Sequence, residues 1–314
     1  MWNIILHIIF LSTLAKAYKK EVSCKVSINE EFGKVCLLEN VNLQTKVNIQ
    51  DKSFKYVFFQ NSEIEFFTDE FVEQLEGIEF LNVNDVGLKH IDGNILGRLN
   101  EIIVFWGSQN EIERVDANTF YECLNLELIS LKFNQISFID EDAFYGLEYL
   151  YKLDLSSNRL KNIERIFKNL YSLVDLDLSS NRIEYLNDET FKHLSNLYAL
   201  SLAKNNLKFL NLKAFDPLVS LEYLNLCFNK SPIPIIYERF LKYNVNMKNI
   251  LLCNNKIKAI ERDFFLNIKP SLDLILLRMN SCTNQDFTVR SKTIISNELM
   301  KFQLCYDNFV DYRV

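Results

Sequence analysis

The stretch 126-LELISLKFNQI-136 is followed by three close copies, 150-LYKLDLSSNRL-160, 173-LVDLDLSSNRI-183 and 197-LYALSLAKNNL-207. The four segments share the pattern L-x-x-L-x-L-x-x-N-x-L, in which the apolar positions and one asparagine recur. Self-similarity at a fixed period is the sequence signature of a repeat architecture. We therefore expect this chain to fold as an array of similar units.

The pattern extends, with some drift, in both directions. Later copies begin at residues 221, 247 and 272, and earlier copies begin at residues 54, 78 and 102. The asparagine position falls at residues 62, 86, 110, 134, 158, 181, 205, 229, 255 and 280, at intervals of 23 to 26 residues. Ser62 and Val86 replace asparagine there, so we expect the first repeats to be less regular than those between 120 and 230.

Each position of the pattern has a physical role. The L-x-L centre predicts a short strand whose alternate side chains point into the core and onto an outer face. One repeat cannot bury its apolar face alone, so neighbouring repeats stack and their strands form a parallel sheet. The asparagine amide can pair with turn backbone groups that would otherwise be buried without partners. The sequence thus predicts an α/β solenoid of about ten repeats with a concave parallel β-sheet.

A ladder of phenylalanines lies in the segments that return from one strand to the next. Most members follow the asparagine position by ten residues, and the ladder comprises Phe120, Phe144, Phe167, Phe191, Phe215 and Phe265. A row of aromatic rings could form a ligand cradle, but these rings keep the register of the apolar core. We therefore interpret them as a spine that fills the convex half of the solenoid.

The composition limits the classes of function. Hydrophobic residues make up 48% of the 314 residues, and the formal net charge is -6. An acidic chain offers no electrostatic footprint for nucleic acid or for an anionic membrane surface. Beyond the first 17 residues only His90 and His193 are histidines, and no phosphate-binding glycine loop or nucleophile motif occurs. We expect no enzymatic activity and no cofactor.

The first residues have the pattern of a secretory signal. Residues 4–14 form an apolar run, and Ala15-Lys16-Ala17 supplies a small-x-small cleavage site. The run is too short to span a bilayer, which takes about 20 residues. We therefore expect a secreted, extracellular product without a membrane span. The expected divisions are a signal peptide (1–17), an N-terminal cap (18–53), the leucine-patterned repeats (54–282) and a C-terminal cap (283–314).

Over residues 54–282 the chain resembles the typical extracellular leucine-rich-repeat family. At the ends, Cys24 and Cys36 precede the first repeat, and the chain closes with 280-NSCTNQDF-287 and 304-LCYDNF-309. This closing pattern is similar to the caps of small secreted leucine-rich-repeat proteins of flies and mosquitoes, and to the leucine-rich immune proteins of mosquitoes. The chain departs from the immune proteins because no heptad coiled coil follows Cys305. The resemblance implies disulfide-stabilised caps.

Seven cysteines in a secreted chain should leave one unpaired. Cys123 occupies an inward apolar position of the repeat and is expected to be a buried thiol. Cys282 lies where Cys305 could reach it and hold the terminal cap, and Cys24 with Cys36 would seal the other end.

A third bridge is expected between Cys227 and Cys253. Both residues take the seventh position of adjacent repeats, on parallel strands about 4.8 Å apart. That separation lies within the Cα range that a disulfide tolerates. Two free thiols on the concave face, or a link between chains, are the alternatives.

The outward strand positions form columns along the concave face, and the first repeats carry an apolar, mostly aromatic patch. Its members are Tyr56, Phe58, Phe80, Val104, Trp106 and Leu128. Contiguous exposed apolar area usually marks an interaction site, and Tyr and Trp are frequent binding anchors. We predict that the patch binds a partner. The alternatives are that the N-terminal cap or a loop folds over it, or that it reflects the preference of strands for aromatic residues.

The second feature of the concave face is the acidic group Asp154, Asp175 and Asp177 in the middle repeats. Like charges directly opposed on neighbouring strands are unfavourable. A basic partner or a cation could offset the repulsion between Asp154 and Asp177, whereas Lys152 beside Asp175 partly neutralises that carboxylate. A solvated acidic stripe is the alternative.

These patterns favour a secreted protein that recognises an extracellular protein ligand or receptor through its concave face. One alternative is an extracellular matrix or structural component that self-associates as a homo-oligomer. A soluble immune recognition factor is another alternative.

Overall fold

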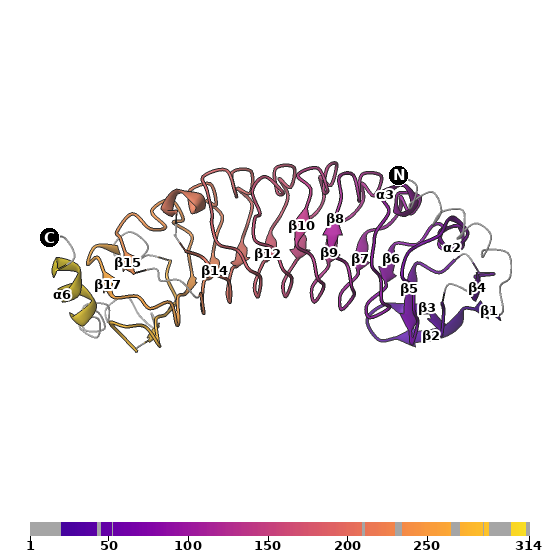
Figure 1. The fold of residues 1–314 in the computed structure, drawn as a ribbon, viewed down its shortest axis with the longest axis horizontal. Helices are drawn as coiled ribbons and strands as arrows, with labels where there is room; N and C mark the ends of the chain where they lie inside the picture. Colours follow the sequence, from indigo (N-terminus) through magenta and orange to yellow (C-terminus); the bar gives the residue numbers. More distant parts are fainter. Residues whose placement is uncertain are drawn as a thin grey trace, which may run out of the picture.

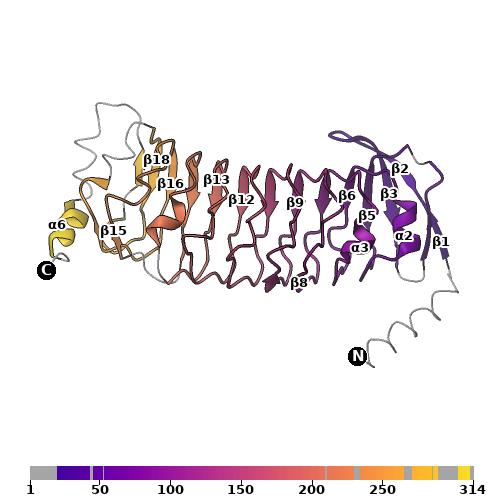
Figure 2. The ribbon, with the colours of Figure 1, turned by 90° about the horizontal axis from the view of Figure 1, so that it is seen from above.

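A computed structural model describes residues 20–42, 45–51, 53–208, 211–229, 234–264, 271–284, 286–288 and 303–311. The predicted signal peptide (1–17) and Phe265 lie outside these residues. The described chain is a curved solenoid with its repeat strands along the concave side (Figure 1). Viewed from above, the repeats follow one another in chain order, from β1 (Lys20–Ser23) at one end to α6 (Gln303–Asp311) at the other (Figure 2).

The main sheet of the described residues has 13 strands, in the order β19-β18-β16-β14-β13-β12-β11-β9-β7-β6-β5-β3-β2. Each repeat strand begins at the third position of its repeat. These strands are β5 (Tyr56–Gln60), β6 (Phe80–Asn82), β7 (Val104–Trp106), β9 (Leu128–Ser130), β11 (Lys152–Asp154), β12 (Asp175–Asp177), β13 (Ala199–Ser201), β14 (Tyr223–Asn225), β16 (Asn249–Leu251) and β18 (Leu274–Leu276). Neighbouring repeat strands pair in parallel, with equivalent positions opposite one another. The predicted leucine-rich-repeat solenoid with a concave parallel sheet is confirmed.

Antiparallel strands continue the sheet at both ends. β2 (Lys25–Asn29) pairs with β3 (Gly33–Glu39), and β3 joins β5 in parallel. At the other end β19 (Asp286–Thr288) pairs with β18. Outside this sheet, β1 pairs with β4 (Thr45–Asn48), and α6 contacts β17 (Ala259–Ile260). The first and last repeats are therefore covered by structure of a different kind.

The segments that return between strands contain few regular elements. They are α2 (Asp69–Gln74), α3 (Gly93–Leu96), the 3-10 helix η1 (Leu212–Phe215), and the short strands β8 (Arg114–Val115), β10 (Phe138–Ile139) and β15 (Ile235–Ile236), besides β17. β8 pairs with β10, and β15 pairs with β17. Elsewhere the described return segments are turns and extended backbone, so stacking on neighbouring repeats holds them in place.

A ladder of buried asparagines connects the turns, as expected. Asn158 is typical: its Oδ1 accepts a hydrogen bond from the backbone N–H of Ile136 at 2.9 Å, and its Nδ2 donates to the carbonyl of Leu131 at 2.9 Å. Both partners belong to the preceding repeat. At the irregular first repeat the Ser62 hydroxyl accepts from Val41 N–H instead, at 3.0 Å. The ladder therefore satisfies backbone groups that stacking removes from water.

The phenylalanine spine fills the convex half of the core. Phe120 and Phe144 stack with ring centroids 5.9 Å apart, and Phe240 lies 6.1 Å from Phe264. Phe264 is a buried member of this row, and the predicted member Phe265 lies outside the described residues. Phe264 follows Asn255 by nine residues, the same short interval that separates Phe167 from Asn158.

The structure contains three disulfides, Cys24–Cys36, Cys227–Cys253 and Cys282–Cys305, with Cα atoms 5.3, 4.6 and 4.9 Å apart. These are the predicted pairings: the repeat register predicted Cys227–Cys253, and the expected caps predicted the two terminal bridges. Cys123 is a free, buried cysteine. Two bridges lie at the ends of the solenoid, and the third joins adjacent strands on the concave side.

Candidate functional site

The N-terminal part of the concave face carries the predicted aromatic patch. Tyr56 and Phe80 stack with ring centroids 4.3 Å apart, and Phe58 lies 6.2 Å from Trp106. Val104 and Leu128 lie opposite each other on the adjacent strands β7 and β9. The parallel register therefore brings all six residues into one contiguous group.

Phe32, at the tip of the β2–β3 hairpin, covers this group. Its ring centroid lies 5.4 Å from that of Tyr56, 6.0 Å from Phe58, 6.2 Å from Phe80 and 5.7 Å from Trp106. The hairpin turn is held by Asn29, whose Oδ1 accepts hydrogen bonds from the backbone N–H groups of Glu31 and Phe32. Gly33 follows with φ +71°, a conformation that glycine adopts readily. The cap thus places an aromatic side chain onto the first repeats.

The alternative in which the N-terminal cap folds over the patch is therefore the arrangement of this structure. Val104 is only 7% exposed and offers a partner almost no surface. The other five predicted contact residues are half-buried. A ligand could reach most of the patch only by contacting or displacing Phe32.

The predicted acidic group lies in the middle of the solenoid, where none of the described residues covers the sheet as Phe32 does. Asp154 is paired in register with Asp177, and Lys152 with Asp175. The ammonium group of Lys152 lies 2.8 Å from a carboxylate oxygen of Asp175. Asp154 and Asp177 instead accept hydrogen bonds from the backbone N–H groups of Ser156 and Ser179, at 3.0 and 2.8 Å. Two carboxylates therefore face each other, and no described cation forms an ion pair with either of them.

Burial raises the pKa of Asp177 above its ordinary value, and the nearby charges of Asp154 and Asp175 raise this pKa further. The hydrogen bonds from Ser179 act in the opposite direction but are outweighed. The ionised form of Asp177 is thus less favourable here than in water. An approaching cation would stabilise the ionised form directly.

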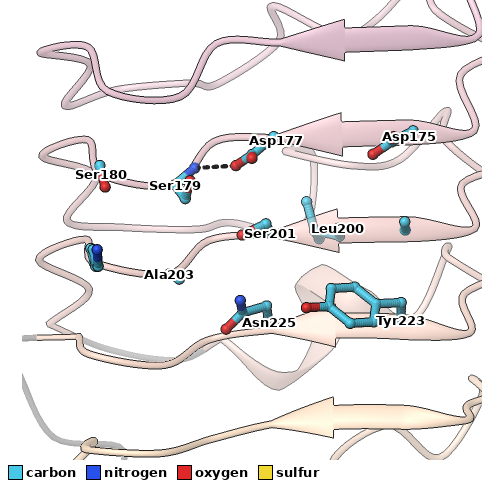
Figure 3. A pocket seen from close by; sticks show the side chains of 11 residues that line it. Asp175, Asp177, Ser179, Ser180, Leu200, Ser201, Ala203, Tyr223 and Asn225 are labelled. Carbon is cyan, nitrogen blue, oxygen red and sulfur yellow. Dashed lines mark hydrogen bonds between the residues drawn. The ribbon is translucent and has the colours of Figure 1, made fainter. Parts of the chain in front are cut away.

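Asp177 borders a hollow of about 390 Å³ that spans β12, β13 and β14. Small side chains form its floor, from Ala199, Ser201 and Ala203, and the larger Tyr223 and Asn225 form the wall opposite the carboxylates. Figure 3 shows this arrangement, with Asp175 and Asp177 on one strand and Tyr223 and Asn225 two strands away. The hollow exists because the outward residues of the β13 repeat are small, whereas the repeats of β12 and β14 on either side carry larger ones.

Burial also raises the pKa of Tyr223, and the negative charge of Asp177 contributes to that increase. The hollow therefore combines two carboxylates, an aromatic ring and an amide within one concavity, and Lys204 also lines it. A lysine or arginine side chain suits this combination, because the carboxylate pairs with the cation and the aromatic face attracts it. The arrangement favours recognition of a basic side chain.

The disulfide Cys227–Cys253 supports the wall of the hollow. The backbone N–H of Cys227 donates to Oδ1 of Asn225 at 3.0 Å, which fixes the orientation of that amide. The bridge then ties the same repeat to the next one. Both cysteines are buried, at 4% and 6% exposure.

The sequence analysis identified Asp175 and Asp177 but neither the hollow nor Phe32. Ala199, Ser201 and Ala203 occupy successive outward positions of one repeat, and that run of small residues was the available signal for a concavity. Phe32 had no comparable signal, since it belongs to no repeat.

In the part of the chain that the structure describes, His, Cys, Asp and Glu side chains form no group of three or more suited to a metal ion. None of the described helices has the length and hydrophobicity that a membrane span requires.

The family model for the leucine rich repeat matches residues 108–160, 148–197 and 171–230 of this chain. The chain is also similar to leucine-rich repeat-containing protein 3B from Bos taurus, Mus musculus and Homo sapiens, at 36% identity over 72 residues. That match covers 22% of this chain and 28% of each relative. The sequence comparisons identify the central repeats as leucine-rich repeats.

Two solved structures are similar in fold. A chain of the Toll–Spatzle complex from Drosophila matches with a TM-score of 0.66 and 18% identity, covering 79% of this chain and 32% of its own length. A chain of the mouse RP105/MD-1 complex matches with a TM-score of 0.64 and 23% identity, covering 74% of this chain and 39% of its own length. At these identities the likeness concerns the fold alone.

Proposed function

We propose that this leucine-rich-repeat solenoid acts outside the cell as a binding protein, and that the middle of its concave face recognises a protein ligand. The observation that carries the proposal is the hollow between β12 and β14, where the half-buried Asp177 faces Tyr223 across a floor of small residues. Concave sites with a few convergent polar groups are the usual places for ligands. The preferred ligand presents an exposed lysine or arginine.

Three further observations support binding as the function. The concave sheet is continuous from β5 to β18, so it offers a rigid, preorganised surface. Three disulfides suit an oxidising, extracellular environment, in agreement with the signal peptide predicted for residues 1–17. Two solved structures of similar fold are complexes, one of Toll with Spatzle and one of RP105 with MD-1. The same fold is therefore found in protein complexes.

Selection from a library of short random peptides tests the proposal. The library is selected on the wild-type protein, and the enriched peptides are then assayed on an Asp177→Asn/Tyr223→Ala variant. We expect enrichment of arginine or lysine, at least tenfold weaker binding to the variant, and binding that weakens as salt is added. Selected peptides without excess basic residues, or equal affinity for the variant, would contradict the proposal.

The chain offers a matched control for this experiment. A second hollow of about 400 Å³, lined in part by Glu164, Glu184 and Tyr185, has similar chemistry but lies beyond the repeat strands. The control variant Glu164→Gln/Tyr185→Ala loses one carboxylate and one aromatic ring there. It should bind the selected peptides as the wild type does.

A further inference from the structure

A row of exposed tyrosines lies along one flank of the solenoid, just before the strands begin. We call this the tyrosine flank; its residues are Tyr145, Tyr149, Tyr151, Tyr171, Val174 and Tyr198. Their exposed fractions run from 37% to 65%. None of these side chains belongs to the concave face or to the hollow.

Backbone hydrogen bonds show that the flank is continuous. Val174 N–H donates to the carbonyl of Tyr151 at 2.8 Å, and Tyr198 N–H donates to the carbonyl of Val174 at 2.8 Å. The row extends at its N-terminal end, where Tyr145 stacks on Tyr121 with ring centroids 5.8 Å apart. Tyr151, Val174 and Tyr198 therefore occupy the same place in consecutive repeats, and Tyr121 and Tyr145 share a second place. Tyr149 and Tyr171 lie one and two residues before the first leucine of their repeats, beside this row.

Such a strip is unusual for a surface in contact with water. Single exposed apolar residues are normal, but contiguous ones mark interaction sites. Tyrosine is favoured in interfaces because it buries a large ring, keeps a polar tip, and has few rotatable bonds to immobilise. The rigid solenoid holds these rings at a fixed spacing, so a matching surface could contact several at once.

The charges beside the strip are arranged in two halves. Glu122, Glu127 and Glu148 lie in the two repeats on its N-terminal side, and Lys168 and Lys192 lie in the next two. A two-fold axis between the repeats of Tyr149 and Tyr171 would place the acidic half of one copy against the basic half of the other. Self-complementarity of this kind is what a two-fold dimer interface requires.

Both lysines already form ion pairs within the chain. Lys168 contacts Glu141 and Asp142, and Lys192 contacts Glu189. These pairs are at the surface, where an ion pair contributes little to stability. The lysines could therefore also contact a carboxylate of a second copy.

We propose that two copies of this chain associate through the tyrosine flank as an antiparallel, two-fold symmetric dimer. Tyr149, Tyr151 and Tyr171 form its centre, and Glu148 of each copy faces Lys168 of the other. The concave face remains open in both copies. A dimer would present two hollows and could bind two ligand sites at once.

Sedimentation velocity over a range of protein concentrations tests this proposal. The wild type should sediment as a dimer at micromolar concentration. The Tyr149→Asp/Tyr171→Asp variant should stay monomeric or dissociate at least tenfold more readily. The control Tyr185→Asp changes an equally exposed tyrosine that follows its strand, and should leave the dimer intact. Circular dichroism of each variant checks that the fold is kept.

A charge exchange gives a second, independent test. Glu148→Lys alone should weaken the dimer, because it opposes two lysines, and the double variant Glu148→Lys/Lys168→Glu should restore it. A monomeric wild type, an unchanged tyrosine variant, or failure of the double variant to restore association would each overturn the proposal. Peptide binding at the hollow should be the same in all these variants, so a failure here leaves the proposed function standing.

Discussion

The ring of Phe32 lies edge-on to the indole of Trp106, with ring centroids 5.7 Å apart and planes inclined by 60°. Phe32 belongs to the cap, and Trp106 belongs to the third repeat. The contact therefore crosses two intervening strands, β5 and β6, and attaches the cap hairpin to the concave face. It also separates the concave face into a covered N-terminal part and an open middle.

Replacing Phe32 with alanine should lower the free energy of unfolding by about 2 kcal/mol. The substitution removes a half-buried ring from contact with four aromatic side chains, and each such pair is worth about 0.5–1.5 kcal/mol beyond its buried area. In a protein without residues 1–17, Trp106 is the single tryptophan, so its emission should shift to longer wavelength. Urea unfolding followed by tryptophan fluorescence measures both effects.

Ile28→Ala is the control for this experiment. Ile28 lies in the same hairpin but is 86% exposed, so its removal should change neither stability nor emission. An unchanged emission maximum in Phe32→Ala would mean that Phe32 does not cover Trp106 in solution.

The repeat register could be predicted from the sequence because stacking is local and periodic. Once Leu153 and Leu176 are placed inward, Asp154 and Asp177 must lie opposite each other on the outer face, as observed. The Cys227–Cys253 pairing follows for the same reason, since these residues occupy equivalent positions of adjacent repeats. Equivalent residues of neighbouring repeats are brought together wherever the period holds.

Features outside the period could not be predicted in this way. The path of the β2–β3 hairpin depends on the Asn29 turn and on where the strands end, neither of which repeats along the chain. Phe264 belongs to the spine although its interval from Asn255 is one residue shorter than in most repeats. The hollow results from the small side-chain volume at Ala199 and Ser201, and only that run of small residues indicates it in the sequence.

Asn158→Ala should lower the free energy of unfolding by about 3 kcal/mol. The substitution leaves the N–H of Ile136 and the carbonyl of Leu131 buried without their hydrogen-bond partners, and each unsatisfied group costs about 1–3 kcal/mol. Asn196→Ala is the matched control, since Asn196 is exposed and its amide donates to the carbonyl of Tyr171. Chemical denaturation compares the two. Equal losses would show that the ladder has no special role.

Ser157→Gly should raise the free energy of unfolding by about 0.5 kcal/mol. Ser157 takes the eighth position of its repeat, which has a φ between 49° and 62° in every repeat, and its own φ is 56°. A side chain in this left-handed region costs the folded state about 1–2 kcal/mol, and glycine avoids this cost. Part of the gain is lost because glycine has more conformational freedom in the unfolded chain. Ser157→Val should be destabilising. A glycine variant less stable than the wild type would contradict the argument.

Stability should fall above pH 9 because of Cys123. Burial, with a smaller contribution from the nearby charge of Glu122, raises the pKa of this thiol from 9.0 to about 12. The folded state then keeps a proton that the unfolded state releases. The contribution of Cys123 is complete below pH 9 and declines by about 1.4 kcal/mol per pH unit as the pH rises toward the folded-state pKa.

The variant Cys123→Ala isolates this effect from the titration of tyrosines and lysines. It should be less stable than the wild type at pH 7, because a buried side chain is shortened, and the difference should shrink between pH 9 and pH 11. Denaturation curves at several pH values measure the difference. A constant difference across this range would mean that the thiol is not buried.

Asp177→Asn should make the protein more stable at pH 7 while it weakens ligand binding. Burial and the charges of Asp154 and Asp175 raise the pKa of Asp177 in the folded state. The contribution of Asp177 to the free energy of unfolding is therefore fully present below the unfolded-state pKa. This contribution is lost as the pH rises through the folded-state pKa. Asparagine keeps the oxygen that accepts from Ser179 but removes the charge facing Asp154. The gain should be about 0.5–1 kcal/mol at pH 7 and should vanish at pH 3, where the carboxyl of the wild type is protonated.

Asp175→Asn should instead lower the free energy of unfolding at pH 7, because it removes the carboxylate that pairs with Lys152. Urea unfolding of both variants at pH 3 and pH 7 distinguishes them. If Asp177→Asn were less stable than the wild type at pH 7, the wild-type carboxylate would be stabilising the fold. The argument that Asp177 is kept for binding a basic ligand would then fail. If the variant is more stable yet binds the selected peptides at least tenfold more weakly, the charge is kept at the expense of stability because binding requires it.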